Sequence, residues 1–208
     1  MVDTLLPRIA IPLPAEGESL DLASLFSDPV DQLWLEIGFG GGEHLAAQAA
    51  NHPKIGIIGV EPFINGVASL LAHIDKDNLK NVRIYGDDVR QIIDAIPINS
   101  LDQVFILFPD PWPKKRHNRR RIISMELLDS LARIMKDNAE FRFASDHMEY
   151  GAWALERATR HPDFQWNART KADWQTPPEG WVTTRYETKG RKKGDVPAYF
   201  TFVRKPRT

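Results

Sequence analysis

The sequence predicts an α/β protein with a mostly parallel sheet, helices on both of its faces and an antiparallel hairpin at one edge. Three observations lead to this class. From residue 33 onward, short apolar runs rich in β-branched residues alternate with segments of helical apolar spacing. The alternation is regular, and no internal repeat or low-complexity linker interrupts it. Such a pattern implies right-handed βαβ crossovers, whose parallel strands are buried on both sides.

Each element can be placed from its local pattern. The first five predicted strands are residues 33–38, 54–61, 81–86, 102–108 and 140–145. The predicted helices are residues 43–50, 63–74, 89–96, 121–135 and 148–160. Residues 181–187 and 198–204 bracket a basic loop and are expected to pair as the hairpin. This brings the predicted sheet to seven strands.

The size and composition of the chain favour one globular domain. We expect residues 1–30, which are rich in proline, to form an N-terminal arm, and residues 31–208 to form a single domain. No apolar stretch approaches the ~18 residues of a membrane span, and no signal peptide is recognisable, so the cytoplasm is the expected location. Cysteine is absent and the six histidines lack ligand spacing, so no metal site is expected. The oligomeric state, monomer or homodimer, stays open.

The net charge of −1 conceals a strong polarity along the chain. Residues 1–50 hold eight acids and a single base, Arg8. Residues 114–121 and 189–207 hold six and seven bases, with Asp195 as the only acid among them. One such cluster is commonly a solvated face, whereas two loop-like clusters favour a surface that binds a polyanion.

An acidic residue stands at the end of each of the first five predicted strands. Glu36 and Glu61 lie at the ends of the first and second strands, and Asp87, Asp110 and Asp146 follow the third, fourth and fifth. Ligands of open parallel sheets bind beyond the carboxyl ends of the strands. We therefore expect these carboxylates to converge on one edge of the sheet and to form a ligand site.

The stretch EIGFGGG, residues 36–42, connects the first strand to the first helix. Its glycines permit a tight turn and the close approach of a ligand to the backbone. The spacing fits ExGxGxG, the first motif of class I S-adenosylmethionine-dependent methyltransferases, better than the dinucleotide fingerprint GxGxxG. Glu36 would face the sulfonium amino acid, Glu61 the ribose hydroxyls, and Asp87 or its neighbour Asp88 the adenine amine. A structural turn with solvated acids is the alternative interpretation.

The stretch FPDPWPKKRHNRRR, residues 108–121, joins a proline-rich turn to a basic run. The prolines should bias Phe108 and Asp110 towards extended backbone and hold the Asp110 carboxylate at the mouth of the site. That carboxylate could orient an acceptor base or accept a proton, or it could serve only the turn. Trp112 would wall the pocket or stack on a base. The bases run against helix preference at a predicted helix start, which favours phosphate contacts.

Together these stretches resemble the bacterial tRNA (guanine-N7-)-methyltransferases. The matching segments are LEIGFGGGEHL (35–45), GVEPF (59–63), NVRIYGDD (81–88), FPDPWPKKRHNRRRI (108–122), FASDHMEY (143–150) and TRYETKG (184–190). The resemblance implies a Rossmann-like class I methyltransferase fold with a mostly parallel seven-stranded sheet. It also implies transfer of a methyl group from S-adenosyl-L-methionine to N7 of the guanine at position 46, in the variable loop of tRNA.

The resemblance assigns roles residue by residue. Asp110 matches the presumed catalytic position. The predicted cofactor-binding residues are Glu36, Gly38, Gly40, Glu61, Asp87, Asp88 and Asp110. The predicted substrate- and RNA-binding residues are Lys114, Arg116, His117, Asn118, Arg119, Arg120, Arg121, Asp146, Thr184, Arg185, Tyr186 and Glu187. Some family members have a basic N-terminal arm, but here the arm is acidic, so a tRNA contact through it is not expected.

Two other functions fit parts of the sequence. A methyltransferase of the same fold that acts on a small molecule or a protein would leave both basic clusters without a role. A non-catalytic RNA-binding module would leave the strand-end carboxylates unexplained. We also expect TRYETKGRKKGD, residues 184–195, to be a mobile loop that closes on tRNA, because Gly190 and Gly194 flank charged residues with little apolar anchorage.

Overall fold

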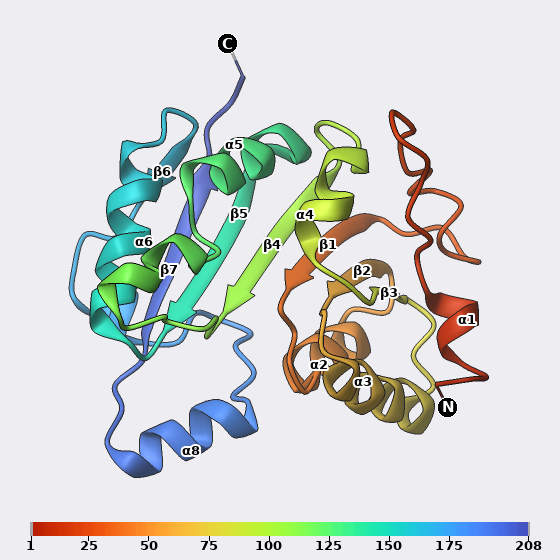
Figure 1. The fold of residues 1–208 in the computed structure, drawn as a ribbon, viewed down its shortest axis with the longest axis horizontal. Coiled ribbons are helices and arrows are strands. Elements are labelled where there is room, and N and C mark those ends of the chain that lie inside the picture. The colour runs from red at the N-terminus through yellow and green to blue at the C-terminus, as the bar shows by residue number, and fades with distance from the viewer. Residues whose placement is uncertain (1, 208) are drawn as a thin grey trace.

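The computed structural model describes residues 2–207 and contains a seven-stranded sheet of order β3-β2-β1-β4-β5-β7-β6 (Figure 1). The strands are β1 (Gln32–Ile37), β2 (Ile55–Val60), β3 (Val82–Tyr85), β4 (Leu101–Leu107), β5 (Met135–Ser145), β6 (Phe164–Trp166) and β7 (Ala198–Arg204). Strands β1 to β5 pair in parallel, and β7 pairs antiparallel with both β5 and β6. The predicted fold class is confirmed.

The helices are α1 (Leu6–Ile9), α2 (Glu43–Asn51), α3 (Ile64–Asp77), α4 (Val89–Ile92), α5 (Met125–Ile134), α6 (Met148–Arg160), α7 (Ala172–Gln175) and α8 (Arg185–Lys193). The longer helices α2, α3, α5 and α6 cover the two faces of this sheet, whereas α8 lies beyond the carboxyl ends of its strands (Figure 1). Two 3-10 turns, η1 (Ile93–Ala95) and η2 (Lys115–Arg120), accompany them. None of the helices within residues 2–207 is long and apolar enough to cross a membrane.

Successive residues of the central strands supply two separate cores. On β1, Trp34 packs with the cluster under α2 and α3, whereas Leu35 packs with the cluster under α4, α5 and α6. Ile57 and Ile58 of β2 divide in the same way. Side chains alternate across a strand, so a continuous apolar run is what a sheet buried on both faces requires.

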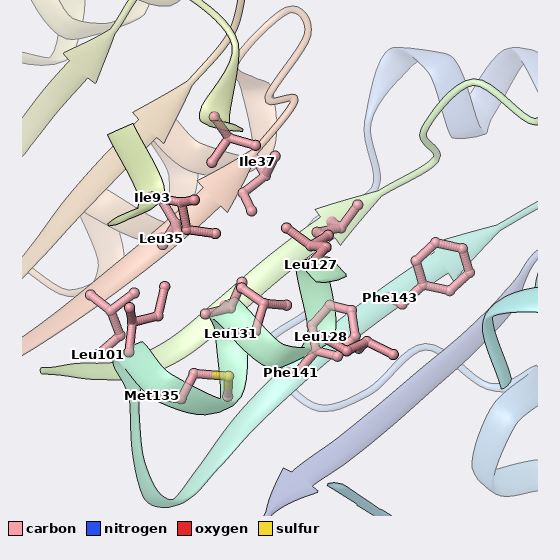
Figure 2. Close-up of a cluster of buried hydrophobic side chains, with 14 of the residues drawn as sticks. Leu35, Ile37, Ile93, Leu101, Leu127, Leu128, Leu131, Met135, Phe141 and Phe143 are labelled. Carbon is pink, nitrogen blue, oxygen red and sulfur yellow. The ribbon is translucent and has the colours of Figure 1, made fainter. Parts of the chain in front are cut away.

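The second of these cores depends on the amphipathic helix α5. The Ser124 hydroxyl accepts a hydrogen bond from the Leu127 amide at 3.2 Å and so caps the helix at its start. Leu127, Leu128 and Leu131 face the sheet, where Figure 2 shows them beside the aromatic rings of β5. The predicted helix over 121–135 therefore begins later than expected, because residues 121–123 belong to the preceding turn.

Of the two strands predicted for the hairpin, one is confirmed and the other is wrong. Residues 198–204 form β7, but residues 181–187 form a loop and the first turn of α8. The antiparallel partners of β7 are β5 and the short β6, residues Phe164–Trp166. Strand β6 was missed because three residues are too few to show an alternating pattern.

The N-terminal segment packs on the sheet over much of its length. Ile9 joins the cluster under α2 and α3, and Ile11, Leu20 and Leu22 join the opposite one. The Ile11 amide donates to the Ile84 carbonyl of β3 at 2.8 Å. The division into an arm over 1–30 and a domain over 31–208 stays a prediction, and its end residues Met1 and Thr208 lie outside the described part of the chain.

Candidate active site and RNA-facing surface

The glycine loop after β1 is the tight turn that the sequence predicts. Gly38, Gly40 and Gly42 have φ of 74°, 55° and 79°, a region that side chains with a Cβ rarely adopt. Helix α3 approaches the loop so closely that a Cβ on Gly66 would lie 2.5 Å from the Gly40 carbonyl oxygen. The loop therefore presents bare backbone at the carboxyl end of β1.

Glu36 lies at the end of β1 and is 3% exposed. Its Oε2 is 2.7 Å from Nδ1 of His44, which projects from the first turn of α2. A buried carboxylate needs such a partner, because burial without one carries a large desolvation cost. The sequence signal for His44 was weak, since a single histidine in an alanine-rich helix resembles an ordinary core residue.

Glu61 lies at the end of β2 and connects that strand to the glycine loop. Its Oε2 accepts a hydrogen bond from the Gly40 amide at 2.9 Å, and its Oε1 accepts one from the Phe63 amide at 3.0 Å. Each carboxylate oxygen has a further lone pair. The side chain can therefore hold the loop and still accept hydrogen bonds from a ligand.

The two aspartates after β3 have different surroundings. Asp88 caps α4 by accepting from the Arg90 amide at 3.0 Å and also from the Arg90 guanidinium at 2.9 Å. These hydrogen bonds hold the pKa of the Asp88 carboxyl below its ordinary value. Asp87 is exposed and accepts a hydrogen bond from the Asp88 amide at 2.7 Å. Of the two predicted contacts with adenine, the geometry favours Asp87.

The PDPW turn after β4 begins and ends on strained residues. Phe108 has φ of 50° and Trp112 has φ of 45°, both in the left-handed region. The prediction of extended backbone at Phe108 is therefore wrong. The Phe108 amide donates to the Ala144 carbonyl of β5 at 2.8 Å, and its ring centroid lies 5.5 Å from that of Tyr186. These tertiary contacts outweigh the local preference of a residue before proline.

The turn brings Asp110 towards the loop after β5 and the start of α8. Partial burial, the nearby Asp146 carboxylate and, more weakly, Asp195 and Asp110 raise the pKa of the Tyr186 hydroxyl to about 12. A Cβ on Gly190 of α8 would lie 3.6 Å from Oδ2 of Asp146. Asp110 and Asp146 follow the paired parallel strands β4 and β5, and Tyr186 lies on α8 next to Asp146, so the three predicted site residues lie at the same edge of the sheet.

Residues 185–193 of the predicted mobile loop form α8, which lies below the carboxyl ends of β4 and β5 in Figure 1. The prediction of a loop is wrong there, and closure on tRNA stays a prediction. Thr184 caps the helix by accepting from the Glu187 amide at 3.2 Å, and the Glu187 carboxylate is buried. Glu187 accepts from Trp181 Nε1 at 2.8 Å and from Arg191 Nη2 at 2.9 Å. These bonds replace the apolar anchorage that the segment lacks.

Two other residues of this segment, Arg185 and Tyr186, are exposed to solvent. Arg185 is exposed and its Nε lies 3.5 Å from Oε1 of Glu43, while Tyr186 is 53% exposed. Thr184 and Glu187 instead stabilise the helix in this arrangement. Their predicted substrate contacts stay predictions.

The basic run forms the 3-10 turn η2 and the residues beside it. Its exposed members are Lys114, Lys115, Arg116, Arg119 and Arg120, and His117 and Asn118 are half-buried. The Arg120 guanidinium lies 4.8 Å from the Trp112 ring centroid, and the His117 ring lies 5.9 Å from it. Trp112 thus packs against Arg120 and His117, and all five cations remain exposed to solvent.

Arg121, the last base of the run, is buried. Its Nε donates to the Pro111 carbonyl at 2.9 Å, and its two terminal nitrogens donate to the Glu149 carboxylate. The guanidinium also lies 4.9 Å from the ring centroids of both Tyr150 and Trp153. This arrangement does not support the predicted RNA contact of Arg121. It fastens the PDPW turn to α6, and nothing in the sequence separates Arg121 from the exposed bases beside it.

The strand order, the glycine loop and the strand-end acids define a class I methyltransferase. Two solved structures share this fold. The 16S rRNA methyltransferase KamB aligns with a TM-score of 0.60 at 17% identity, over 87% of this chain and 95% of that one. The aminoglycoside resistance methyltransferase NpmB1 aligns with a TM-score of 0.60 at 12% identity, over 85% and 89%. At these identities the likeness shows the fold alone.

Sequence comparison identifies the family. A family model described as "Putative methyltransferase" matches residues 31–199. The chain is 52% identical to the tRNA (guanine-N(7)-)-methyltransferase of Rhodospirillum rubrum, over all of this chain and 82% of that protein. It is 47% identical to the Rhizobium meliloti enzyme of the same name, over 98% and 87%. The chain belongs to the tRNA (guanine-N(7)-)-methyltransferase family.

Proposed function

We propose that this protein transfers a methyl group from S-adenosyl-L-methionine to N7 of the guanine at position 46 in tRNA. One observation supports this function best. Asp110 and Asp146 follow the neighbouring parallel strands β4 and β5 at the same edge of the sheet, and five exposed cations of residues 114–120 follow Asp110 in the same loop. A nucleobase site that adjoins a phosphate-binding surface is what an RNA-modifying enzyme needs.

The residues at the ends of β1, β2 and β3 fit the cofactor. Glu36 provides negative charge for its cationic amino-acid end, and the Glu61 oxygens can accept from the ribose hydroxyls. Asp87 is exposed and can accept from the adenine amine. The left-handed glycines let the backbone approach the cofactor closely. The cofactor supplies a methyl group on a positively charged sulfonium, which is already activated for transfer.

Asp110 would orient the guanine. N7 of guanine carries a free lone pair, so alignment rather than base catalysis is the main requirement. A carboxylate that accepts N–H bonds from the base fixes its plane and offsets the positive charge that methylation creates. Asp146, which follows the neighbouring strand β5, and Tyr186 beside it would add polar groups to this site.

The exposed bases would hold the tRNA backbone. Lys114, Lys115, Arg116, Arg119 and Arg120 face solvent next to the PDPW turn. Three exposed lysines of α8, Lys189, Lys192 and Lys193, add positive charge, whereas Arg191 is paired with the buried Glu187 carboxylate. Each phosphate that they neutralise releases counterions, so tRNA binding should weaken steeply with salt.

Methyl transfer from labelled S-adenosyl-L-methionine tests the proposal. The label should enter bulk tRNA, and nucleoside analysis should recover it as 7-methylguanosine. A tRNA with adenine in place of the guanine at position 46 should accept no label. Label in a different nucleoside would contradict the site assignment. Label confined to proteins or small molecules would favour the alternative methyltransferase, and no transfer at all would favour a binding module.

A further inference from the structure

A chain of buried polar side chains lies behind the predicted cofactor acid Glu36. His44 is 2% exposed and Gln48, one helical turn later on α2, is 5% exposed. Glu36 Oε2 lies 2.7 Å from His44 Nδ1, and His44 Nε2 lies 3.2 Å from Gln48 Nε2. Gln48 Nε2 also donates to the Gly180 carbonyl at 3.0 Å. Three polar side chains are thus joined in a region from which water is excluded.

The distances in this hydrogen-bond network determine which atom donates and which atom accepts. The Gln48 amide has two N–H groups, and one of them is used by the Gly180 carbonyl. Its second N–H points to His44 Nε2, which must then act as an acceptor. The ring proton therefore resides on Nδ1, where it donates to the Glu36 carboxylate. The network assigns a neutral histidine with a defined tautomer, and it directs one donor at one oxygen of Glu36.

The far end of this chain reaches the segment that leads into α8. Trp181 follows Gly180, and its ring centroid lies 5.7 Å from that of His44. Trp181 Nε1 donates to the buried carboxylate of Glu187 at 2.8 Å. The same polar chain thus connects the end of β1 with the helix that carries Tyr186.

We propose that His44 is a positioning residue for the methyl transfer. It holds the Glu36 carboxylate in the orientation that receives the cationic end of the cofactor, and Gln48 fixes the tautomer that makes this possible. Through the Gly180 carbonyl, Gln48 also holds the start of the α8 segment in place. The inference rests on the proposed function, because it requires Glu36 to contact the cofactor.

Two conservative variants of His44 separate positioning from packing. An asparagine at this position keeps an N–H close to the place of Nδ1, whereas a glutamine keeps one close to the place of Nε2. Loss of a hydrogen bond to a charged group corresponds to roughly a tenfold loss of affinity. We therefore expect His44→Gln to weaken S-adenosylmethionine binding about tenfold, and His44→Asn to stay within about threefold of the original protein. Titration calorimetry with purified full-length protein measures both values.

A matched control comes from His161. This residue is also 2% exposed, and its Nε2 lies 3.0 Å from Oδ1 of Asp129, remote from the proposed site. His161→Asn should lower the melting temperature and leave the affinity for S-adenosylmethionine unchanged. For the second link, Gln48→Met removes both donors at similar volume. It should speed hydrogen exchange in residues 180–187.

The outcomes distinguish the inference from the function on which it rests. If Glu36→Gln binds S-adenosylmethionine as tightly as the original protein, the assignment of Glu36 to the cofactor fails. If Glu36→Gln binds weakly while both His44 variants bind normally, the role of His44 is overturned and the function stands. Equal weakening by asparagine and glutamine would also overturn it, because packing alone would then explain the loss. Unchanged exchange in Gln48→Met would contradict the link to α8.

Discussion

The cofactor edge of the sheet and the RNA-facing surface are built on opposite principles. At the cofactor edge, Glu36 and Glu61 are almost fully buried, and each carboxylate has a hydrogen-bond partner within the chain. On the RNA-facing surface, Arg116 and Arg119 extend into solvent from a 3-10 turn. The folded chain itself therefore sets the geometry of the cofactor edge. The second region supplies charge whose final arrangement depends on the phosphates that it meets.

Desolvation explains this contrast. A buried carboxylate must be hydrogen-bonded, so the fold has to settle its position before any ligand arrives. An exposed arginine keeps its hydration and its rotamer freedom, and it loses them only when it binds. Substitutions in the first region should therefore change turnover, cofactor affinity or stability. Substitutions in the second should change tRNA affinity and its salt dependence.

The largest effect is expected at Asp110, where the two regions meet. Asp110→Ala should lower kcat by about 100-fold, because one preorganised electrostatic contact to a reacting group is typically of that size. S-Adenosylmethionine binding should weaken far less than kcat falls, because Glu36, Glu61 and Asp87 are unchanged. Single-turnover methylation of tRNA and cofactor titration measure the two quantities, with Asp75→Ala on the exposed end of α3 as the control. Near-normal turnover with normal cofactor binding would remove Asp110 from the mechanism.

The next effect concerns the basic run. Replacement of Arg116, Arg119 and Arg120 by alanine should raise KM for tRNA more than tenfold at moderate salt. It should also reduce the magnitude of the slope of log affinity against log salt concentration by about 2 to 3. This is roughly 0.7 to 0.9 for each phosphate that the variant no longer neutralises. Filter binding over a salt series measures the slope.

Three lysines near the amino ends of β2 and β3 provide the matched control for this charge change. They are exposed in the same way and are Lys54, Lys76 and Lys80. Their replacement by alanine should leave the slope unchanged. An equal loss of slope in both triple variants would mean that net charge, rather than the surface beside Asp110, governs tRNA binding.

Although Arg121 belongs to the basic run, its replacement should lower stability rather than tRNA affinity. Arg121→Ala should lower the free energy of unfolding by about 2 kcal/mol, because a buried side chain with hydrogen bonds to Pro111 and Glu149 is removed. The ion pair itself adds little, since Glu149 is more than half exposed. Urea denaturation measures the loss. Unchanged stability with a flatter salt slope would restore Arg121 to the RNA-facing surface.

The smallest effect is expected at Asp88. Asp88→Ala should reduce the free energy of unfolding by about 1 kcal/mol at neutral pH, through loss of the helix cap. The folded-state pKa of Asp88 lies below its ordinary value because of Arg90, so its ionised form stabilises the fold at neutral pH. This contribution should disappear as the pH falls through the lowered pKa. The unfolding curves of Asp88→Ala and of the original protein should therefore differ at neutral pH and coincide at acidic pH.

A cofactor titration distinguishes Asp87 from Asp88. Asp87→Ala should weaken the binding of S-adenosylmethionine, and Asp88→Ala should leave it nearly unchanged. The reverse result would assign the adenine contact to Asp88.

The parallel part of the fold could be predicted from the sequence because apolar runs indicate its strands and helical spacing indicates the helices between them. The strand-end acids could be predicted for the same reason, since topology alone brings Glu36, Glu61 and Asp87 to one edge. The region after residue 160 could not. There β6 is too short for a pattern, and polar hydrogen bonds to Glu187 rather than apolar periodicity stabilise α8.

The individual roles within the site were less predictable than its location. Arg121 differs from Arg120 only in its tertiary contacts, which no local pattern records. The left-handed Phe108 follows from contacts with β5 and Tyr186, against the preference set by the next proline. The contact between His44 and Glu36 forms only when α2 packs against the end of β1, so no local pattern predicts it.

The N-terminal segment has a consequence for how copies of this chain meet one another. Strand β3 lies at one margin of the sheet, where unpaired backbone groups could recruit a strand from another molecule. Ala10 forms a parallel bridge with Ile84, and Arg83 donates to the Leu25 carbonyl, so the first residues of the chain cover this margin. At the other margin β6 is only three residues long. A segment with no proposed part in catalysis thus covers a strand margin where another chain could otherwise pair.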